Sequence, residues 1–199
     1  FGSEIKAILA HPEVKLEINK EGILEYLTFQ NFLSEQTLFK NIHILATGSF
    51  YIFNLDNNCK KVKYWDFNFE EPLSYSRSLD DYREECHYLL KQAVKRQLIS
   101  DVEIGSYLSG GMDSGTITAI ASNDIDNLRS FTCGFDISSA SGIERGMDER
   151  QLAESMSSIF KTEHYQVVLK AGDMERVMKK LIWHIEEPRV GQSYPNFYV

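Results

Sequence analysis

Hydrophobic and polar positions follow two periods in the second half of the chain, and each period predicts one type of element. Short apolar runs alternate with segments in which apolar residues recur every three or four positions, as on one face of a helix. The runs at 104–108, 129–135 and 163–169 predict strands, and the segments at 116–121, 148–160 and 173–185 predict helices. Strand–helix alternation is typical of a parallel sheet with helices on both faces. We therefore expect an α/β fold here, with ligands bound at the carboxyl ends of the strands.

Residues 1–66 have a different pattern, which predicts a separate α+β unit. Helical spacing is found at 3–9 and 20–29, and two strand-like runs at 49–55 and 59–65 flank an Asp-Asn-Asn turn, as in a hairpin. The stretch that follows is acidic, then serine-rich, and contains Pro72, which is typical of a linker. The expected organisation is one domain at 1–66, a linker at 67–77 and a second domain at 78–199.

A long helix is expected at the start of the second domain, with Ser78 as its N-cap and two aspartates in its first turn. Its apolar face is expected to pack in the core and consists of Leu79, Tyr82, Cys86, Leu89, Leu90, Ala93 and Val94. His87 lies off this face and is expected to be exposed. In the later helix at 148–160, the residues expected to point inward are Leu152, Met156 and Ile159.

Composition limits the class of protein. The chain has 199 residues, 43% of them hydrophobic, and a net charge of −8, which is typical of a globular protein and argues against nucleic acid as the main partner. Its three cysteines, Cys59, Cys86 and Cys133, show no metal-ligand spacing, and so sparse a set fits a reducing compartment. The sequence contains no apolar run of membrane-spanning length, and we expect no signal peptide. We expect a cytoplasmic protein without a membrane partner.

The motif with the clearest chemistry is Ser-Gly-Gly-Met-Asp-Ser at 109–114, between a predicted strand and a predicted helix. A glycine turn that leads into a helix N-terminus offers backbone N–H groups and a positive dipole end, so it suits an anion. Gly110 and Gly111 allow close approach of the backbone, and Ser109 and Ser114 add hydroxyl donors. Asp113 fits a phosphate site if Mg²⁺ bridges its carboxylate to the phosphate oxygens.

The motif differs from the other common phosphate loop, because the Gly-x-x-x-x-Gly-Lys-Ser/Thr pattern does not occur in the chain. It is similar to the pyrophosphate loop of the ATP pyrophosphatases, which split ATP between its α and β phosphates. The alternative is a Gly-Gly turn that only joins a strand to a helix. The strand before the motif and the helix after it favour phosphate binding.

Several other segments accompany this loop, and together they lie at 1–9, 37–48, 63–65, 101–102, 108–114, 148–149, 161–164 and 184–188. In their order and spacing, these segments resemble the glutamine-dependent asparagine synthetase family over nearly the whole chain. The resemblance implies that the chain carries the end of a class II glutaminase domain and the first part of an ATP-pyrophosphatase domain. Departures from the family pattern are Gly115, Met112 and the pair Ala46-Thr47, and none of them changes the expected fold.

The resemblance also implies roles for the residues around the loop. Leu108 and Cys133 match positions that contact the adenosine of ATP, and for Cys133 this is a backbone or packing role. Plain strand core is an equal alternative for Cys133. The pyrophosphate would be held by Ser109, Gly110, Gly111 and Ser114, and Asp113 would bind Mg²⁺.

The implied function is ATP-dependent synthesis of asparagine. Aspartate would be adenylated by MgATP with release of pyrophosphate, and ammonia from glutamine would then displace AMP. The alternatives are a family relative that amidates another carboxylate, such as a sugar acid or a peptide, or closes a β-lactam, and a non-catalytic nucleotide-binding module. The expected partners are small molecules, aspartate or a related carboxylate, glutamine and ATP. The oligomeric state is open, with a homodimer as one option.

Both ends of the chain look cut. In the family, the glutaminase nucleophile is an N-terminal cysteine, and a second Ser-Gly loop would follow Val199. We therefore expect residues 1–199 alone to be inactive, with the catalytic residues unknown.

Three further sites have competing interpretations. His164, beside a strand start, is expected to be structural or solvated. Glu186 and Glu187 end a helix, where the dipole disfavours carboxylates, which weakly suggests a role near a cation or a substrate amine. Asp148 and Glu149 begin a helix and are expected to cap it.

Overall fold

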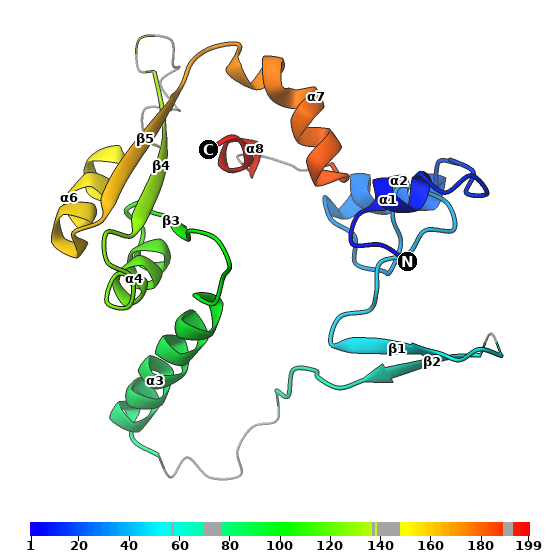
Figure 1. Ribbon diagram of the computed structural model, residues 1–199, viewed down its shortest axis with the longest axis horizontal. Coiled ribbons are helices and arrows are strands. Elements are labelled where there is room, and N and C mark those ends of the chain that lie inside the picture. The colour runs from blue at the N-terminus through cyan, green and yellow to red at the C-terminus, as the bar shows by residue number, and fades with distance from the viewer. Residues whose placement is uncertain (57, 70–76, 137, 139–147, 189–192) are drawn as a thin grey trace. The chain divides into compact units, whose positions relative to one another are not determined.

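The computed structural model separates into two compact units (Figure 1). One unit combines Phe1–Leu73 with Ile182–Gly191, and the other combines Ser74–Leu181 with Gln192–Val199. The residues that the structure describes are 1–56, 58–69, 77–136, 138, 148–188 and 193–199. Most of the expected linker, 67–77, lies outside them, so the division expected at that place stays a prediction.

The larger unit is built on a three-stranded parallel sheet. Its strands are β3 (Gly105–Tyr107), β4 (Arg129–Phe135) and β5 (Glu163–Leu169), in the order β3-β4-β5. Both pairings are parallel, with Tyr107 opposite Phe131 and Cys133 opposite Val167. The three predicted strands are confirmed, although Ile104 and Leu108 lie just outside the short β3.

Helices flank this sheet, which confirms the α/β class. From residue 77 on, the helices in the described part of the chain are α3 (Leu79–Gln97), α4 (Met112–Ala121), α6 (Arg150–Phe160), α7 (Asp173–Ile185) and α8 (Ser193–Tyr198). Alternate side chains of β4 point to opposite faces. Gly134 faces α6, because a Cβ there would clash with the Arg150 side chain. Phe131 and Cys133 face the other way and share a pocket with Pro195 and Asn196 of α8, a helix the sequence did not predict.

The hydrophobic core of this unit is small and lies at the C-terminal end of α3. Val94, Ile120, Ala121 and Leu128 are buried together, with Leu98 and Ile125 packed against them. Ser78 caps α3 as predicted, in a capping box with Asp81. Of the apolar face expected along α3, only Val94 is buried. The prediction is wrong for the other residues of that face, because the core meets the helix only near its C-terminal end. The exposed ones are Leu79, Tyr82, Cys86, Leu89, Leu90 and Ala93. His87 is exposed as predicted.

The buried face of α6 also differs from the prediction. Leu152 and Ile159, expected to point inward, are 58% and 73% exposed, whereas Ala153 and Ser157 are buried. Of the three expected residues, only Met156 is partly covered. Small residues take the inward positions because the glycine loop and β4 approach the helix closely, and a large side chain would not fit between them.

Hydroxyl groups form a polar layer between the sheet and its helices. The Ser106 hydroxyl bonds the Thr118 hydroxyl at 2.8 Å. The Ser130 hydroxyl bonds that of Thr162 at 2.8 Å and His164 Nδ1 at 2.9 Å. Burial lowers the pKa of His164, against the opposing effect of Glu154, and its Nε2 is buried without a partner in the described part of the chain. His164 was expected to be either structural or solvated, and its partly buried hydrogen bond to Ser130 confirms the structural role.

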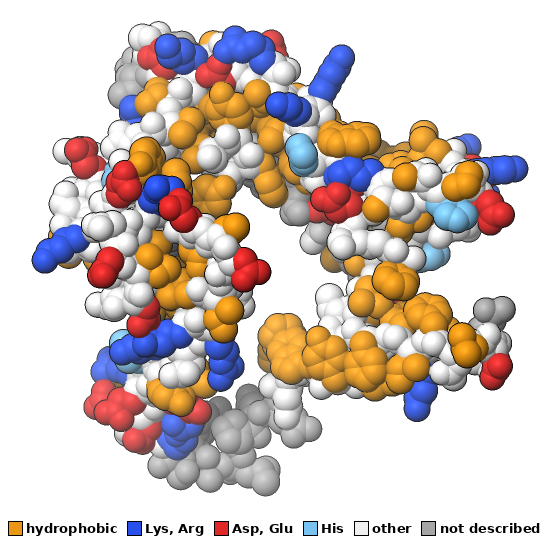
Figure 2. Space-filling view, viewed as in Figure 1, with side chains coloured by type: hydrophobic (Ala, Val, Ile, Leu, Met, Phe, Trp, Pro, Cys, Tyr) orange, Lys and Arg blue, Asp and Glu red, His pale blue; other side chains and the backbone are white. Residues whose placement is uncertain are grey.

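The smaller unit contains α1 (Ile5–Leu9), α2 (Lys20–Phe29) and the antiparallel hairpin of β1 (Ser49–Phe53) and β2 (Cys59–Lys63). These elements confirm the helices and the hairpin predicted there. The Asn19 side chain caps α2 by accepting from the Glu21 N–H. Figure 2 shows hydrophobic side chains gathered along the hairpin, where Phe53, Tyr64 and Trp65 are exposed. No helix in the described part of the chain is long and apolar enough to cross a membrane.

Glu186 holds α1 in the smaller unit. Its carboxylate accepts from the backbone N–H of Ile5 at 2.6 Å and of Lys6 at 2.7 Å, and lies 3.2 Å from Lys6 Nζ. It thus serves as a cap for two of the N–H groups that a helix start leaves unpaired. Burial alone would raise the pKa of Glu186, but these hydrogen bonds and the Lys6 charge outweigh it and lower the pKa. The sequence suggested a cation or a substrate amine near Glu186, and in the structure the cation beside it is the ammonium group of Lys6.

Replacing Glu186 by Gln should loosen α1. Gln keeps the size of the side chain, but it loses the charge and one acceptor, which costs about 1–3 kcal/mol. Hydrogen exchange of the amides at 5–9 in the full-length protein should accelerate about tenfold at pH 7. The matched control is Glu175→Gln, an exposed carboxylate on α7. Because the folded pKa is lowered, the stabilisation is complete above the usual glutamate value of 4.5 and is lost as the pH falls through the folded value. Unchanged exchange in Glu186→Gln would contradict this role.

Candidate functional site

The glycine loop folds around two serine hydroxyls. Ser114 Oγ accepts from the Ser109 N–H at 3.1 Å and lies 3.0 Å from Ser109 Oγ. The Gly111 N–H in turn donates to Ser109 Oγ at 3.3 Å. The loop that joins β3 to α4 is therefore held in one shape by its own side chains.

Gly110 is the point where the loop meets α6. Its φ is +84°, a left-handed conformation that favours glycine. A Cβ at this position would lie 2.6 Å from Leu152 Cβ and 3.2 Å from the Ala153 nitrogen. The loop thus depends on glycine both for its backbone conformation and for its contact with the first turn of α6.

The N-terminus of α4 follows the loop. Gly111 is its N-cap and makes no side-chain cap bond, and Asp113 lies in the first turn with an exposed side chain. The positive helix end and two nearby hydroxyls suit an anion. Asp113 thus places one exposed carboxylate beside this helix end. Proteins that bind Mg²⁺ together with a phosphate ligand do so through one or two carboxylates. No cluster of three or more metal-ligating His, Cys, Asp or Glu residues occurs within the described ranges.

A pocket of about 350 Å³ opens beside the loop at the carboxyl ends of β3 and β4. This volume lies within the range of small-ligand sites. Four of the predicted site residues line it, namely Leu108, Ser109, Ser114 and Cys133. Gly110, Gly111 and Asp113 belong to the same loop and helix start but are not among the lining residues.

Other lining residues were missed by the sequence analysis. Tyr107, Phe131 and Phe135 belong to strands that were predicted, and their alternation could have placed them near the end of the sheet. Glu149 was considered only as a helix cap. Asn196 and its neighbours on α8 have no motif that could have indicated them, and Tyr107 donates its hydroxyl to the Asn196 carbonyl at 2.9 Å.

The backbone of Leu108 is anchored to β4 at both of its polar groups. Its N–H donates to the Phe131 carbonyl at 2.9 Å, and its carbonyl accepts from the Thr132 hydroxyl. In a parallel ladder, alternate residues of a strand bond to the same neighbour. Since Phe131 bonds toward β3, the N–H and carbonyl of Cys133 point to that side too, just past the end of β3. The pocket lies there.

The Cys133 thiol is poorly suited to chemistry. Burial raises its pKa, and this effect exceeds the lowering by Arg150, so the thiol stays protonated near neutral pH. Cys133 is half-buried and lines the pocket. The contribution open to it is therefore its main chain and its packing.

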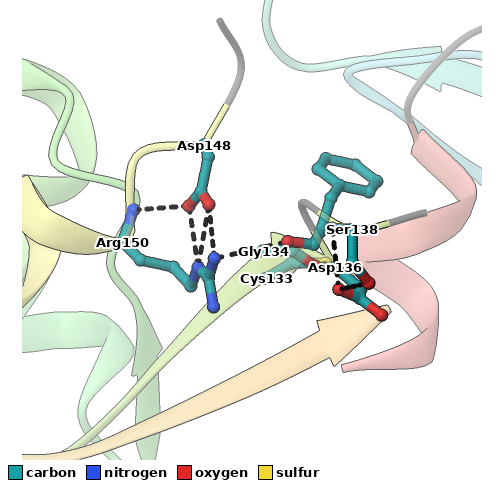
Figure 3. A network of polar contacts seen from close by, with 7 residues as sticks. Cys133, Gly134, Asp136, Ser138, Asp148 and Arg150 are labelled. Atoms are coloured by element: carbon teal, nitrogen blue, oxygen red, sulfur yellow. Dashed lines mark hydrogen bonds and ion pairs between the residues drawn. The ribbon is translucent and has the colours of Figure 1, made fainter. Parts of the chain in front are cut away.

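An ion pair between Asp148 and Arg150 lies at the carboxyl end of β4 (Figure 3). Arg150 Nε lies 2.8 Å from Asp148 Oδ1, and Arg150 Nη2 donates to the Phe135 carbonyl at 3.3 Å. The hydrogen bond from Arg150 lowers the pKa of Asp148. Nearby, the Ser138 hydroxyl donates to Asp136 at 2.7 Å and lowers the pKa of that carboxyl.

Of the two residues expected to cap α6, only Asp148 makes a bond of this kind. Its Oδ1 accepts from the Arg150 N–H at 3.2 Å. Glu149 occupies the N-cap position without a side-chain cap bond, so the capping prediction is wrong for Glu149. Its side chain contributes to the wall of the pocket instead.

Comparison with known proteins matches both parts of the chain to family models. Residues 85–199 match the family model of asparagine synthase, and residues 1–65 match the model of a glutamine amidotransferase domain. The first match covers more than half of the chain. The chain therefore belongs to the asparagine synthase family.

The relatives are similar over nearly the whole chain. A Methanocaldococcus jannaschii protein assigned as a glutamine-hydrolysing asparagine synthetase is 33% identical over 100% of this chain, which covers 38% of that protein. Asparagine synthetase 3 of Bacillus subtilis is 31% identical over 98% of the chain, which covers 32% of it. A Penicillium rubens protein named as an amidase is 26% identical over 94% of the chain, which covers 28% of it. The chain thus spans roughly a third of the length of these relatives.

The geometry of the loop predicts different costs for its two glycines. Gly110→Ala adds a Cβ that meets α6 and places alanine at positive φ, so we expect a loss of about 2–4 kcal/mol in the free energy of unfolding. Gly111→Ala is the control, since its Cβ would meet only Ser109 Oγ at 3.3 Å. Thermal unfolding followed by circular dichroism compares the two. Equal stability of both variants would argue against the contact between the loop and α6.

Proposed function

We propose that the larger unit binds MgATP and that the full-length protein is a glutamine-dependent ligase that makes asparagine from aspartate. The observation that carries this proposal is the loop at 109–114, which ends a parallel strand, begins a helix and opens into a pocket of about 350 Å³. Membership of the asparagine synthase family supports the choice of reaction. The match of residues 1–65 to a glutamine amidotransferase domain supports glutamine as the source of ammonia.

In this proposal each site residue has one task. The backbone of Gly110 and Gly111 and the hydroxyls of Ser109 and Ser114 hold the pyrophosphate portion of ATP. The adenosine lies against Leu108 and Cys133, with its base next to the main chain of Cys133. Asp113 would hold Mg²⁺, which would supply positive charge to the phosphate oxygens.

The reaction would proceed through an acyl-adenylate. A carboxylate oxygen of aspartate attacks the α-phosphorus of ATP, and the bond to the bridging oxygen breaks, so pyrophosphate leaves with its electrons. Loop N–H groups and the α4 N-terminus are fixed before the reaction and stabilise the charge that develops on the leaving group. Ammonia then attacks the activated carbonyl carbon, AMP leaves, and the amide forms with release of a proton. The catalytic residues for glutamine hydrolysis and amide formation are unassigned.

One assay tests this proposal against two alternatives. The acceptor could be a different carboxylate, because a relative in Penicillium rubens is named as an amidase and not as an asparagine synthetase. A non-catalytic nucleotide-binding module would use the same loop and pocket without turnover. A pyrophosphate-release assay on the full-length protein, with a panel of carboxylates and with and without glutamine, separates the three. A cytoplasmic location and a homodimer remain predictions.

Asp113→Asn should abolish Mg²⁺-dependent cleavage of ATP. The amide keeps the shape of the side chain but is a much weaker ligand for a hard cation. We expect pyrophosphate release by the full-length variant to fall about 100-fold or more, with an unchanged circular dichroism spectrum. Asp126→Asn is the control, because Asp126 is exposed beyond the other end of α4. Activity of Asp113→Asn near the wild-type level would remove the metal role.

The nucleotide products test the reaction class independently of any variant. A loop of this type, with no lysine to reach the γ-phosphate, should release pyrophosphate and AMP. Chromatography of the nucleotides after turnover by the full-length protein measures them. A dominant ADP peak would overturn the proposed chemistry.

A further inference from the structure

The hydrogen bonds between β3 and β4 change partner one residue after β3 ends. The regular parallel ladder stops with the bond from the Leu108 N–H to the Phe131 carbonyl. In a continued ladder, the next bond would run from the Cys133 N–H to the Leu108 carbonyl. Within the described residues, that carbonyl accepts instead from the Thr132 hydroxyl. A side chain has taken the place of the backbone donor.

This exchange has a physical consequence, because both partners are buried. Leu108 is 0% exposed and Thr132 is 3% exposed. A buried carbonyl needs a donor, and without the Thr132 hydroxyl the nearest candidate in the ladder is the Cys133 N–H. The hydroxyl therefore satisfies the Leu108 carbonyl and leaves the Cys133 N–H directed to the pocket.

We propose that Thr132 is a positioning residue that determines base specificity, by keeping the Cys133 N–H available to the base of a bound nucleotide. This inference rests on the proposed binding of ATP in the pocket. The Cys133 N–H is a donor, and the Cys133 carbonyl next to it is an acceptor. Adenine presents an acceptor at N1 beside the donor at N6, whereas guanine presents a donor at N1 beside an acceptor at O6. The Cys133 main chain thus matches adenine and opposes guanine.

The contacts of Thr132 are separate from those that hold the phosphate loop, so recognition of the base and binding of the phosphates can be tested separately. The Thr132 hydroxyl bonds Leu108, whereas the loop from Ser109 to Ser114 is held by its own hydroxyls and by its contact with α6. Removal of the Thr132 hydroxyl should therefore weaken the recognition of adenine and spare the binding of pyrophosphate. A purely structural role in supporting the loop would weaken both.

The test measures binding to the full-length protein by calorimetry, with α,β-methylene-ATP, the corresponding GTP analogue and pyrophosphate, each with Mg²⁺. In Thr132→Val the Leu108 carbonyl should turn to the Cys133 N–H. We expect the affinity for the ATP analogue to fall about tenfold, the preference over the GTP analogue to shrink by a similar factor and the affinity for pyrophosphate to stay within about twofold. Thr132→Ser keeps the donor and should restore wild-type values. Thr118→Val is the control, since Thr118 is a buried threonine with a hydroxyl bonded to Ser106.

A second measurement does not depend on the folding of a variant. In the wild-type protein, the amide resonance of Cys133 should shift on addition of the ATP analogue and not on addition of pyrophosphate. Three results would overturn the proposal. Thr132→Val could bind the ATP analogue as tightly as the wild type does, or its affinity for pyrophosphate could fall by the same factor as its affinity for the ATP analogue. The third is a Cys133 amide resonance that does not shift on addition of the ATP analogue. Failure of the wild-type protein to bind any nucleotide would instead overturn the proposed function.

Discussion

The close approach of Gly110 to the first turn of α6 is the constraint on which the site depends. A backbone at positive φ, with no room for a Cβ, fixes where the loop lies relative to α6. It also explains why the inward positions of α6 are the small residues Ala153 and Ser157, while its larger apolar residues are displaced to the surface. The loop, α6 and the end of β4 are thereby held together, and the pocket forms beside them.

The polar layer of hydroxyl groups between the sheet and its helices also stabilises the loop and the strand ends. With hydrophobic packing alone, the backbone N–H and carbonyl groups at the ends of short strands would have no hydrogen-bond partners. Ser130, Thr118 and Thr132 are almost fully buried, and each bonds a side chain or carbonyl of a neighbouring element. Directional bonds of this kind specify one register of the sheet more narrowly than apolar contacts do, because a shifted strand would leave buried polar groups unpaired.

Features that depend on local sequence could be predicted, and features that depend on distant neighbours could not. The strands β4 and β5, the cap at Ser78 and the loop at 109–114 each follow from adjacent residues. The wall that α8 adds to the pocket, and the exposed first turns of α3, depend on which element packs against which. Strand alternation assigns Thr132 to a face, but it cannot show that its hydroxyl meets the Leu108 carbonyl.

The contact between Glu186 and α1 has a consequence for synthesis on the ribosome. The two partners are 181 residues apart, and the smaller unit needs both Phe1–Leu73 and Ile182–Gly191. At typical rates of translation, on the order of 10–40 s would pass between emergence of α1 and emergence of the carboxylate that caps it. During this interval the larger unit can form its local contacts, whereas α1 gains its cap only after Glu186 has been synthesised and has come into contact with it. The order of folding would thus run against the order of the chain.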